Sequence, residues 1–498
     1  MKKKKVLASV ATVTVFGVFT RILSFIFKIY LSRALGAEAI GLYQIAISVF
    51  YLFASLSSSG IPLVLSRKTA ETEALHDKND YSLFTTALLL GLIVSSVSLI
   101  ILSIFNKYLY FLFSDQGAYP LFLVMLPALL STTVYSVIRG WFWGKKEFTA
   151  FSATETVEEV LRILFSVLFI SGLIAGISGA YAVCLAFTVS DIIIAIVLFA
   201  VFLAKGGKPE KPASFKKIFL PALPVTAMRL FASLIGTLVA IILPLRLVDF
   251  GLSPSDATAS FGRIAGMANP LLFAPNAIIG SLAIVLVPEM SANGAKKQFA
   301  TLNKHLNNGI NFAFLVSGLF MVLYLALGEE ITTLLYDDVE SGKYLSFAAI
   351  LMLPMSLSQL TQSALNSIGK EPLTFLNFVI GELFLVAAIV ILPQFIGIYS
   401  VAVASMLALL ITSVLNVYAL RKYVNFSFGF LKYLALVVLF LFPSAFLSEC
   451  INDLLAPHVK ILALILASAG GLIMYCGLCL GTEIVDIKGF IKLRKKSA

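Results

Sequence analysis

The sequence predicts an all-α polytopic membrane protein with about fourteen spanning helices. Its 498 residues are 59% hydrophobic and only 13% charged, which leaves too little polar surface to cover a soluble globule of that length. The apolar residues stand in long runs, most of which exceed the roughly 20 residues that a helix needs to cross a bilayer. These runs lack the alternation of apolar and polar residues that membrane-spanning strands require.

The predicted spans follow one another along the whole chain. Many of the apolar runs contain no charged residue, and they occupy residues 39–66, 81–106, 116–138, 163–190, 264–288, 306–328, 344–369, 383–420, 433–448 and 461–482. Others are interrupted by a few charges and occupy residues 6–33, 149–172, 218–247 and 372–393. Glycines divide the stretches 163–204 and 383–420, which brings the expected number of helices to about fourteen.

Lysines and arginines predict the side of each loop, because cytoplasmic loops retain positive charge during insertion. Lys2 to Lys5 place the N-terminus in the cytoplasm, and an even number of spans returns the C-terminus to that side. Most of the 37 basic residues then share the cytoplasmic face: Arg67, Lys68, Lys145, Lys146, Lys205 to Lys217, Lys296 to Lys304, Lys370, Arg421, Lys422 and Lys488 to Lys496. The net charge of +11 therefore indicates contact with anionic lipid headgroups in the cell membrane and not with nucleic acid.

Cysteine and histidine residues predict no metal site and no cofactor. Cys184, Cys476 and Cys479 fall within apolar runs, and Cys450 lies in a predicted loop without a partner near it in the sequence. On a membrane helix, the spacing of Cys476 and Cys479 is better explained by packing of small apolar side chains than by a redox pair. The histidines are scattered among loops, so they form no set of metal ligands.

An internal repeat predicts two parallel halves. Met125–Ser131 reads Met-Leu-Pro-Ala-Leu-Leu-Ser and recurs at Met352–Ser358 as Met-Leu-Pro-Met-Ser-Leu-Ser. Each copy opens a helix and is followed by a hairpin, whose turn reads Gly-Ile-Ser-Gly from Gly176 or Gly-Ile-Tyr-Ser from Gly397. An even number of helices separates the matching elements, so the halves are related by an axis along the membrane normal and can rock against each other.

Residues 205–217 form the one stretch rich in Pro, Gly and Lys, and this composition predicts a cytoplasmic linker between the halves. The expected domains are an N-lobe of six helices, the basic linker, a C-lobe of six helices, two further helices outside the repeat and a basic cytoplasmic tail. They occupy residues 1–204, 205–217, 218–425, 426–482 and 483–498. The two further helices could provide a groove for a large apolar substrate.

Basic residues inside the spans are candidate binding residues, because a charge in the bilayer costs several kcal/mol unless it faces a partner or a water-filled cavity. Arg21 and Lys28 lie seven residues apart in the first span and therefore share a face. Arg229 takes the corresponding place in the seventh span, and Arg263 opens the eighth. We expect these side chains to bind an anionic substrate, because guanidinium groups bind phosphate oxygens in pairs and stay charged when desolvated.

Acidic residues inside the spans offer another explanation of these charges. In the fifth span, Glu155, Glu158, Glu159 and Arg162 form a stripe on one face, and Glu158 and Arg162 can pair along their own helix. A self-satisfied pair that fixes helix packing explains this stripe as well as a role in a cavity does. The candidate cations could also extend to a headgroup or pair with one of the following acids: Glu155, Glu158, Asp191 and Glu382.

Several segments together resemble one family of membrane transporters. They are Arg21–Phe25, Leu35–Gln44, Ser59–Leu63, Ser66–Glu71, Arg139–Lys146, Glu158–Arg162, Phe261–Pro270 and Val287–Ser291. Their order and spacing over nearly the whole chain resemble the stage V sporulation protein B group. That group belongs to the MurJ-like, polysaccharide-transporter branch of the multidrug/oligosaccharidyl-lipid/polysaccharide exporter superfamily.

The resemblance implies two MATE-like lobes of six helices and a flippase that carries no cofactor. The expected substrate is a polyprenyl-pyrophosphate-linked saccharide, such as the peptidoglycan precursor lipid II or a related cell-envelope precursor, moved from the inner to the outer leaflet by alternating access. In MurJ-like members, cavity arginines of helices 1 and 8 hold the pyrophosphate, and they correspond here to Arg21 and Arg263. A second arginine of helix 1 falls on Phe27, beside Lys28. The protein is expected to act as a monomer, with other envelope-synthesis proteins as possible partners.

Two alternative functions stay open. A drug or small-solute antiporter of the same superfamily, driven by Na⁺ or H⁺, would need an intramembrane carboxylate, for which Asp191 and Glu382 are the candidates. A membrane glycosyltransferase or polymerase would need a cluster of acidic or metal-binding residues on a sizeable aqueous loop. The longest loops run to only about 15 residues and hold no such cluster, so an enzyme is not expected.

Overall fold

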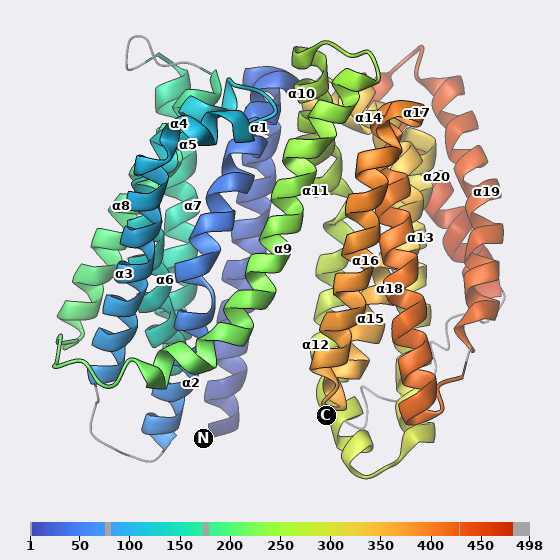
Figure 1. The fold of residues 1–498 in the computed structure, drawn as a ribbon. Coiled ribbons are helices and arrows are strands. Elements are labelled where there is room, and N and C mark those ends of the chain that lie inside the picture. Colours follow the sequence, from blue (N-terminus) through green and yellow to red (C-terminus); the bar gives the residue numbers. More distant parts are fainter. Residues whose placement is uncertain (1, 75–80, 173–178, 428, 482–498) are drawn as a thin grey trace. The chain divides into compact units, whose positions relative to one another are not determined.

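A computed structural model describes residues 2–74, 81–172, 179–427 and 429–481 of the chain. Across these ranges the secondary structure is helical and contains no strand, so the all-α prediction is confirmed (Figure 1). The predicted basic tail, residues 483–498, lies outside the described residues. Contacts divide the chain into two compact units: unit 1 comprises Met1–Gly262 and unit 2 comprises Arg263–Ala498.

The described residues contain 11 helices that are long and apolar enough to cross a membrane, or up to 12 if the bent pair α5 and α6 forms one span. This establishes a multi-pass membrane protein, but the expected number of about fourteen spans is not confirmed. One apolar segment, Val13–Glu73, covers two of the predicted spans. Its backbone turns at Gly36, where φ is 77°, a conformation that glycine adopts without strain. The charged stripe on α7 keeps that helix out of the apolar set.

Unit 1 holds the first ten α-helices and one short 3₁₀ turn. Their bounds are α1 (Lys2–Ser58), α2 (Gly60–Ala74), α3 (Ser82–Ile104), α4 (Asn106–Leu109), η1 (Tyr110–Leu112), α5 (Ala118–Met125), α6 (Ala128–Gly144), α7 (Phe148–Ile170), α8 (Gly179–Ala204), α9 (Lys216–Asp249) and α10 (Pro254–Gly262). The bend of 49° between α5 and α6 falls at Pro127, since a proline ring cannot follow a regular helical turn without displacing it.

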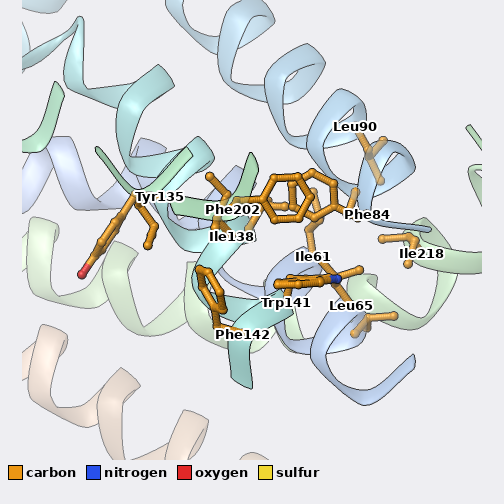
Figure 2. Packing of buried hydrophobic residues seen from close by; sticks show 14 of the residues in the cluster. Ile61, Leu65, Phe84, Leu90, Tyr135, Ile138, Trp141, Phe142, Phe202 and Ile218 are labelled. Atoms are coloured by element: carbon orange, nitrogen blue, oxygen red, sulfur yellow. The ribbon is translucent and has the colours of Figure 1, made fainter. Parts of the chain in front are cut away.

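The aromatic core of unit 1 joins α2, α3, α6 and α8, and Figure 2 shows its packing. The rings of Phe84 and Phe202 stack with their centroids 4.1 Å apart, and Trp141 meets Phe202 edge to face at 5.0 Å. Such contacts add to the free energy that burial alone supplies. Ile218 and Ala222 of α9 complete this core, so the first turns of α9 pack with the helices that precede them.

Residues 205–215, which connect α8 to α9 and which we call the strap, are fastened along the start of α3. The backbone N–H of Glu210 donates to the Thr85 hydroxyl at 3.0 Å, and the Thr86 hydroxyl donates to the Ala213 carbonyl at 3.3 Å. The division between compact units at Gly262 thus lies beyond the strap and beyond α9. The lobe boundary at 205–217 remains a prediction about the repeat, and it differs from the boundary between packed units.

Two glycines allow α1 and α10 to pack backbone against backbone within unit 1. A Cβ atom added to Gly41 would lie 2.8 Å from the carbonyl carbon of Thr258, and one added to Gly262 would lie 2.7 Å from the amide nitrogen of Gly41. The Thr258 hydroxyl donates to Asp115 Oδ2 at 2.8 Å, which ties α10 to the loop before α5 as well. Helix α10 is therefore held tightly against the rest of unit 1.

Unit 2 begins with a π-helical turn and contains the remaining helices. Their bounds are η2 (the π-helix Arg263–Ala268), α11 (Asn269–Leu272), α12 (Ala274–Ala295), α13 (Phe299–Tyr336), α14 (Val339–Ala348), η3 (Ala349–Leu351), α15 (Met352–Ser367), α16 (Glu371–Ile391), α17 (Pro393–Ile396), η4 (Gly397–Tyr399), α18 (Ser400–Val424), α19 (Phe430–Leu455) and α20 (Lys460–Gly481). Within this unit, α13 packs against α12, α14, α15, α19 and α20.

Polar and small side chains fix the packing within unit 2. Asn377 of α16 donates to Asn416 of α18 at 2.9 Å, and Asn416 donates in turn to the Thr361 hydroxyl of α15 at 3.3 Å. Gly318 of α13 lies against the ring of Tyr475, so α20 approaches α13 closely. The C-terminal pair α19 and α20 lie side by side, coloured orange to red in Figure 1, and both contact α13.

Candidate functional site

The orientation of α1 is set by residues that pack inside unit 1. Thr20 is buried, and its hydroxyl shares a hydrogen bond of 2.8 Å with the Thr156 hydroxyl of α7. Phe27 is 6% exposed, one heptad further along the same face. Arg21 and Lys28 each follow one of these buried residues, and both of their side chains are exposed. The packed face of α1 therefore places the two cations together on the adjacent, open face.

Arg229 provides a third exposed cation on α9, a helix that packs against α1 within unit 1. The two helices are linked where the Thr237 hydroxyl of α9 donates to the Ser48 carbonyl at 2.9 Å. In the part of the chain that the structure describes, Arg21, Lys28 and Arg229 form no ion pair with an acidic residue. Glu159 acts on Lys28 only through its electric field, and none of the acids considered from the sequence lies within ion-pair distance of these three cations.

Arg263 differs because it has an acidic partner in unit 2. Its Nε donates to Asp338 at 2.9 Å from Oδ2 and 3.2 Å from Oδ1. Asp338 is the N-cap of α14, where its Oδ1 also accepts from the backbone N–H of Ser341 at 2.7 Å. The sequence did not point to Asp338, since it lies 75 residues away in a connection between helices.

The charged stripe of α7 satisfies itself with partners inside unit 1. Arg162 forms ion pairs with Glu158 and, at 3.1 Å, with Glu159. Glu155 pairs with Arg139 of α6 at 3.2 Å. The guanidinium of Arg139 also lies over the ring of Phe151, 4.2 Å from its centroid. Sequence reasoning named Arg139 within a family-like segment but did not predict its ion pair, although this charge directly follows an uncharged run and marks a polar position at the end of that span.

Asp191 and Glu382, the two candidates for ion coupling, have different surroundings. Asp191 of α8 is 3% exposed, and it accepts hydrogen bonds from Ser131 Oγ at 2.6 Å and Thr132 Oγ1 at 2.9 Å. Among the described residues it has no ion-pair partner. Glu382 lies on α16 of unit 2 and is half-buried. Asp191 is therefore a buried carboxyl group held by hydroxyl groups alone.

No group of three or more His, Cys, Asp or Glu side chains suited to a metal ion occurs in the described ranges. Within the described residues no disulfide joins any of the cysteines, which are Cys184, Cys450, Cys476 and Cys479. What the geometry offers is thus electrostatic. It comprises three cations on α1 and α9 that form no ion pair in the described residues, one oriented arginine in unit 2, and a partly buried cluster of ion pairs around α7.

Comparison with known sequences identifies relatives over nearly the whole chain. The sequence model of a family described as polysaccharide biosynthesis protein matches residues 6–294. The stage V sporulation protein B of Bacillus subtilis (strain 168) is 24% identical over 499 residues, covering 94% of this chain and 94% of that protein.

Comparison with solved structures shows the fold. A lipid II flippase MurJ in an inward closed conformation matches with a TM-score of 0.73 at 15% identity, covering 95% of this chain and 98% of that one. An inward-facing multidrug resistance MATE family transporter of the MOP superfamily matches with a TM-score of 0.71 at 14% identity, covering 82% and 94%. The architecture is therefore that of multi-span membrane transporters.

Proposed function

The chain belongs to the polysaccharide biosynthesis protein family, and from this premise we propose that it flips a polyprenyl-pyrophosphate-linked saccharide across the cell membrane. The sequence resemblance to the stage V sporulation protein B and MurJ-like branch of the MOP superfamily is confirmed, and the chain is a membrane transporter or flippase, not an enzyme. The identity of the substrate is what we propose in addition to this family assignment.

The observation that carries the proposal is the set of exposed, unpaired cations on α1 and α9. Arg21, Lys28 and Arg229 lie in helices apolar enough to cross the membrane, and within the described part of the chain none of them forms an ion pair. Each such charge costs several kcal/mol in a bilayer unless an anion or water compensates it. A pyrophosphate supplies the missing negative charge, and its oxygens match the paired donors of a guanidinium group.

The substrate we propose is lipid II or a related cell-envelope precursor. The solved structure that matches with a TM-score of 0.73 is a lipid II flippase, which supports this substrate class, and the relative with 94% coverage is a sporulation protein, so we keep related envelope precursors within the proposal. Alternating access would expose the arginines first to the cytoplasm and then to the outside, while the polyprenyl tail stays in the bilayer. In this proposal both termini lie in the cytoplasm, and the protein acts as a monomer. Other envelope-synthesis proteins supply its lipid-linked substrate.

The test is flipping of a labelled polyprenyl-pyrophosphate saccharide in proteoliposomes. We expect Arg21→Ala and Arg229→Ala each to slow flipping by about tenfold or more, because each removes charge-assisted hydrogen bonds to the substrate. Arg246→Ala is the matched control, since Arg246 also lies on α9 but pairs with Asp249 at 2.9 Å. A native protein that leaves the lipid unflipped, or arginine variants that flip at the native rate, would refute the proposal.

A second candidate, an ion-coupled antiporter, is favoured by one observation. Asp191 is 3% exposed and, among the described residues, accepts side-chain hydrogen bonds only from the hydroxyls of Ser131 and Thr132. A buried carboxyl group with such surroundings is suited to exchange a proton or Na⁺ during transport. Uptake of an organic cation driven by a Na⁺ or H⁺ gradient, abolished in Asp191→Asn, would favour this function. Transport that does not depend on the ion gradient in either the native protein or Asp191→Asn would reject the antiporter function.

A further inference from the structure

We propose that Asp338 is a positioning residue for Arg263: it holds the guanidinium through Nε and leaves the two terminal nitrogens free to bind a pyrophosphate. This inference rests on the proposed function. It adds Asp338, an acidic residue that was not among the candidate binding residues. The geometry of the pair, the frame that holds it and the backbone at Arg263 each support it.

The contact uses only one edge of the guanidinium group. Both oxygens of Asp338 accept from Nε, at 2.9 and 3.2 Å, and no hydrogen bond to either terminal nitrogen of Arg263 occurs within the described residues. The Arg263 side chain is 25% exposed, so it is not sealed in the protein. An arginine held in this way keeps the pair of terminal N–H groups that binds phosphate oxygens bidentately.

Asp338 is itself fixed at the start of α14. Its Oδ1 accepts from the Ser341 N–H at 2.7 Å, and the Ser341 hydroxyl donates back to the Asp338 carbonyl at 2.9 Å. An N-cap of this kind restrains the carboxylate, because the side chain is already committed to the first turn of the helix. The side chain of Asp338 is only 15% exposed, so its position is set by the protein and not by solvent.

A closed chain of contacts ties both partners to the same frame in unit 2. Helix α14 is fastened to α13 where the Ser346 hydroxyl donates to the Tyr324 carbonyl at 2.7 Å. The Tyr324 hydroxyl then donates to the Leu271 carbonyl of α11 at 3.0 Å, and α11 directly follows the π-helix that Arg263 opens. Arg263 and Asp338 thus belong to one braced assembly, in which the pair cannot easily drift apart.

The backbone at Arg263 is an independent indication of function. Arg263–Ala268 is π-helical, whereas α10 before it and α11 after it are α-helical. Such turns are rare and occur frequently at functional sites, where they turn a side chain away from the regular helical position. The local distortion and the anchored carboxylate both act on the direction of the same guanidinium group.

The experiment measures binding of farnesyl pyrophosphate to the full-length protein in detergent by calorimetry, with farnesol as the uncharged blank. We expect Asp338→Ala to weaken binding by about tenfold, because the guanidinium loses its fixed orientation, and Asp338→Asn to weaken it less, since Asn still caps α14 and still accepts from Nε. Glu340→Ala is the matched control, because Glu340 lies in the same turn and pairs with Lys343 at 2.6 Å. It should bind as the native protein does.

A double variant separates positioning from a general structural effect. In an Arg263→Ala background, Asp338→Ala should cause no further loss of affinity, because its effect acts through the guanidinium. Additive losses, an equal loss in Glu340→Ala, or tighter binding in Asp338→Ala would overturn the inference, the last because Asp338 would then be a competitor of the substrate. If the native protein fails to bind the pyrophosphate, the proposed function fails together with this inference. If it binds and only the Asp338 variants are unaffected, the inference alone fails.

Discussion

Charged side chains inside the spans are either paired or unpaired, and this difference decides what each can do. Arg162 lies between two carboxylates of its own helix, so its charge is already compensated and it fixes helix packing. Arg21 has an exposed side chain and no acid within ion-pair distance in the described ranges. A compensated charge stabilises the fold, whereas an uncompensated one is available to a ligand.

The paired arginine leads to a stability prediction. Arg162→Met should lower the free energy of unfolding by about 3 to 5 kcal/mol, because it leaves the half-buried Glu158 and the buried Glu159 without their partner. Arg246→Met, which breaks an exposed pair with Asp249, should cost less than about 1 kcal/mol. The free energies of unfolding of the two variants are measured in the same detergent and compared with that of the native protein. Equal losses would show that the α7 cluster is no more important than a surface pair.

Phe27 is the position to which the sequence resemblance assigns a second arginine of MurJ-like members, and in this structure it is a packing residue. Because its side chain is 6% exposed, Phe27→Arg should destabilise the protein by several kcal/mol and should not add a working cation. Phe27→Leu keeps an apolar side chain and should cost far less. Measured stability and flipping rates would check both. A stable Phe27→Arg protein that flips faster would place this residue on the substrate route.

At the scale of elements, close approach of two backbones determines where α10 lies. Gly41 and Gly262 are positions at which α1 and α10 meet without intervening side chains, and a hydrogen bond from Thr258 to Asp115 holds the same helix from another direction. The sequence shows these glycines but not their purpose, since a glycine in an apolar run can equally mark a bend or a turn. Only the packed structure distinguishes them.

Two glycine substitutions, one at this contact and one at an open position of α9, should change the free energy of unfolding in opposite directions. Gly41→Ala should destabilise the protein by about 1 to 3 kcal/mol, because the new Cβ would lie 2.8 Å from the Thr258 carbonyl carbon. Gly236→Ala should stabilise it by about 0.5 to 1 kcal/mol, since nothing lies within 4 Å of that position in α9 and alanine favours a helix. Thermal unfolding measures both. Destabilisation by both variants would mean that backbone crowding at Gly41 is not the cause.

At the scale of the whole molecule, the distribution of lysines and arginines predicts which loops face the cytoplasm. Cys450 is exposed near the end of α19, in a region that the charge pattern places outside the cell. A membrane-impermeant maleimide should label Cys450 in intact cells. On a Cys450→Ser background, Lys211→Cys in the strap should react only after permeabilisation. Labelling of both sites from the outside would reverse or refute the proposed topology.

The sequence predicted the helical class, the membrane location and the family, because hydrophobic run length and motif order are local properties that do not depend on tertiary contacts. It also identified Glu158 and Arg162 as able to pair, since four residues along a helix bring side chains together. It could not find Asp338 or Arg139 as ion-pair partners, because those contacts join separate helices. The role of the candidate cations in binding stays a prediction.

The dependence of the unit 1 core on α9 has a consequence for the order of synthesis. The core shown in Figure 2 requires Ile218, yet this residue follows the strap and belongs to the seventh predicted span. A nascent chain that has emerged only as far as α8 cannot complete that core. Until α9 is inserted, the first six predicted spans therefore expose the apolar surface that Ile218 and Ala222 later cover. We expect chaperoning by the insertion machinery to matter most in that interval, and a ribosomal pause before α9 to be more harmful than one after it.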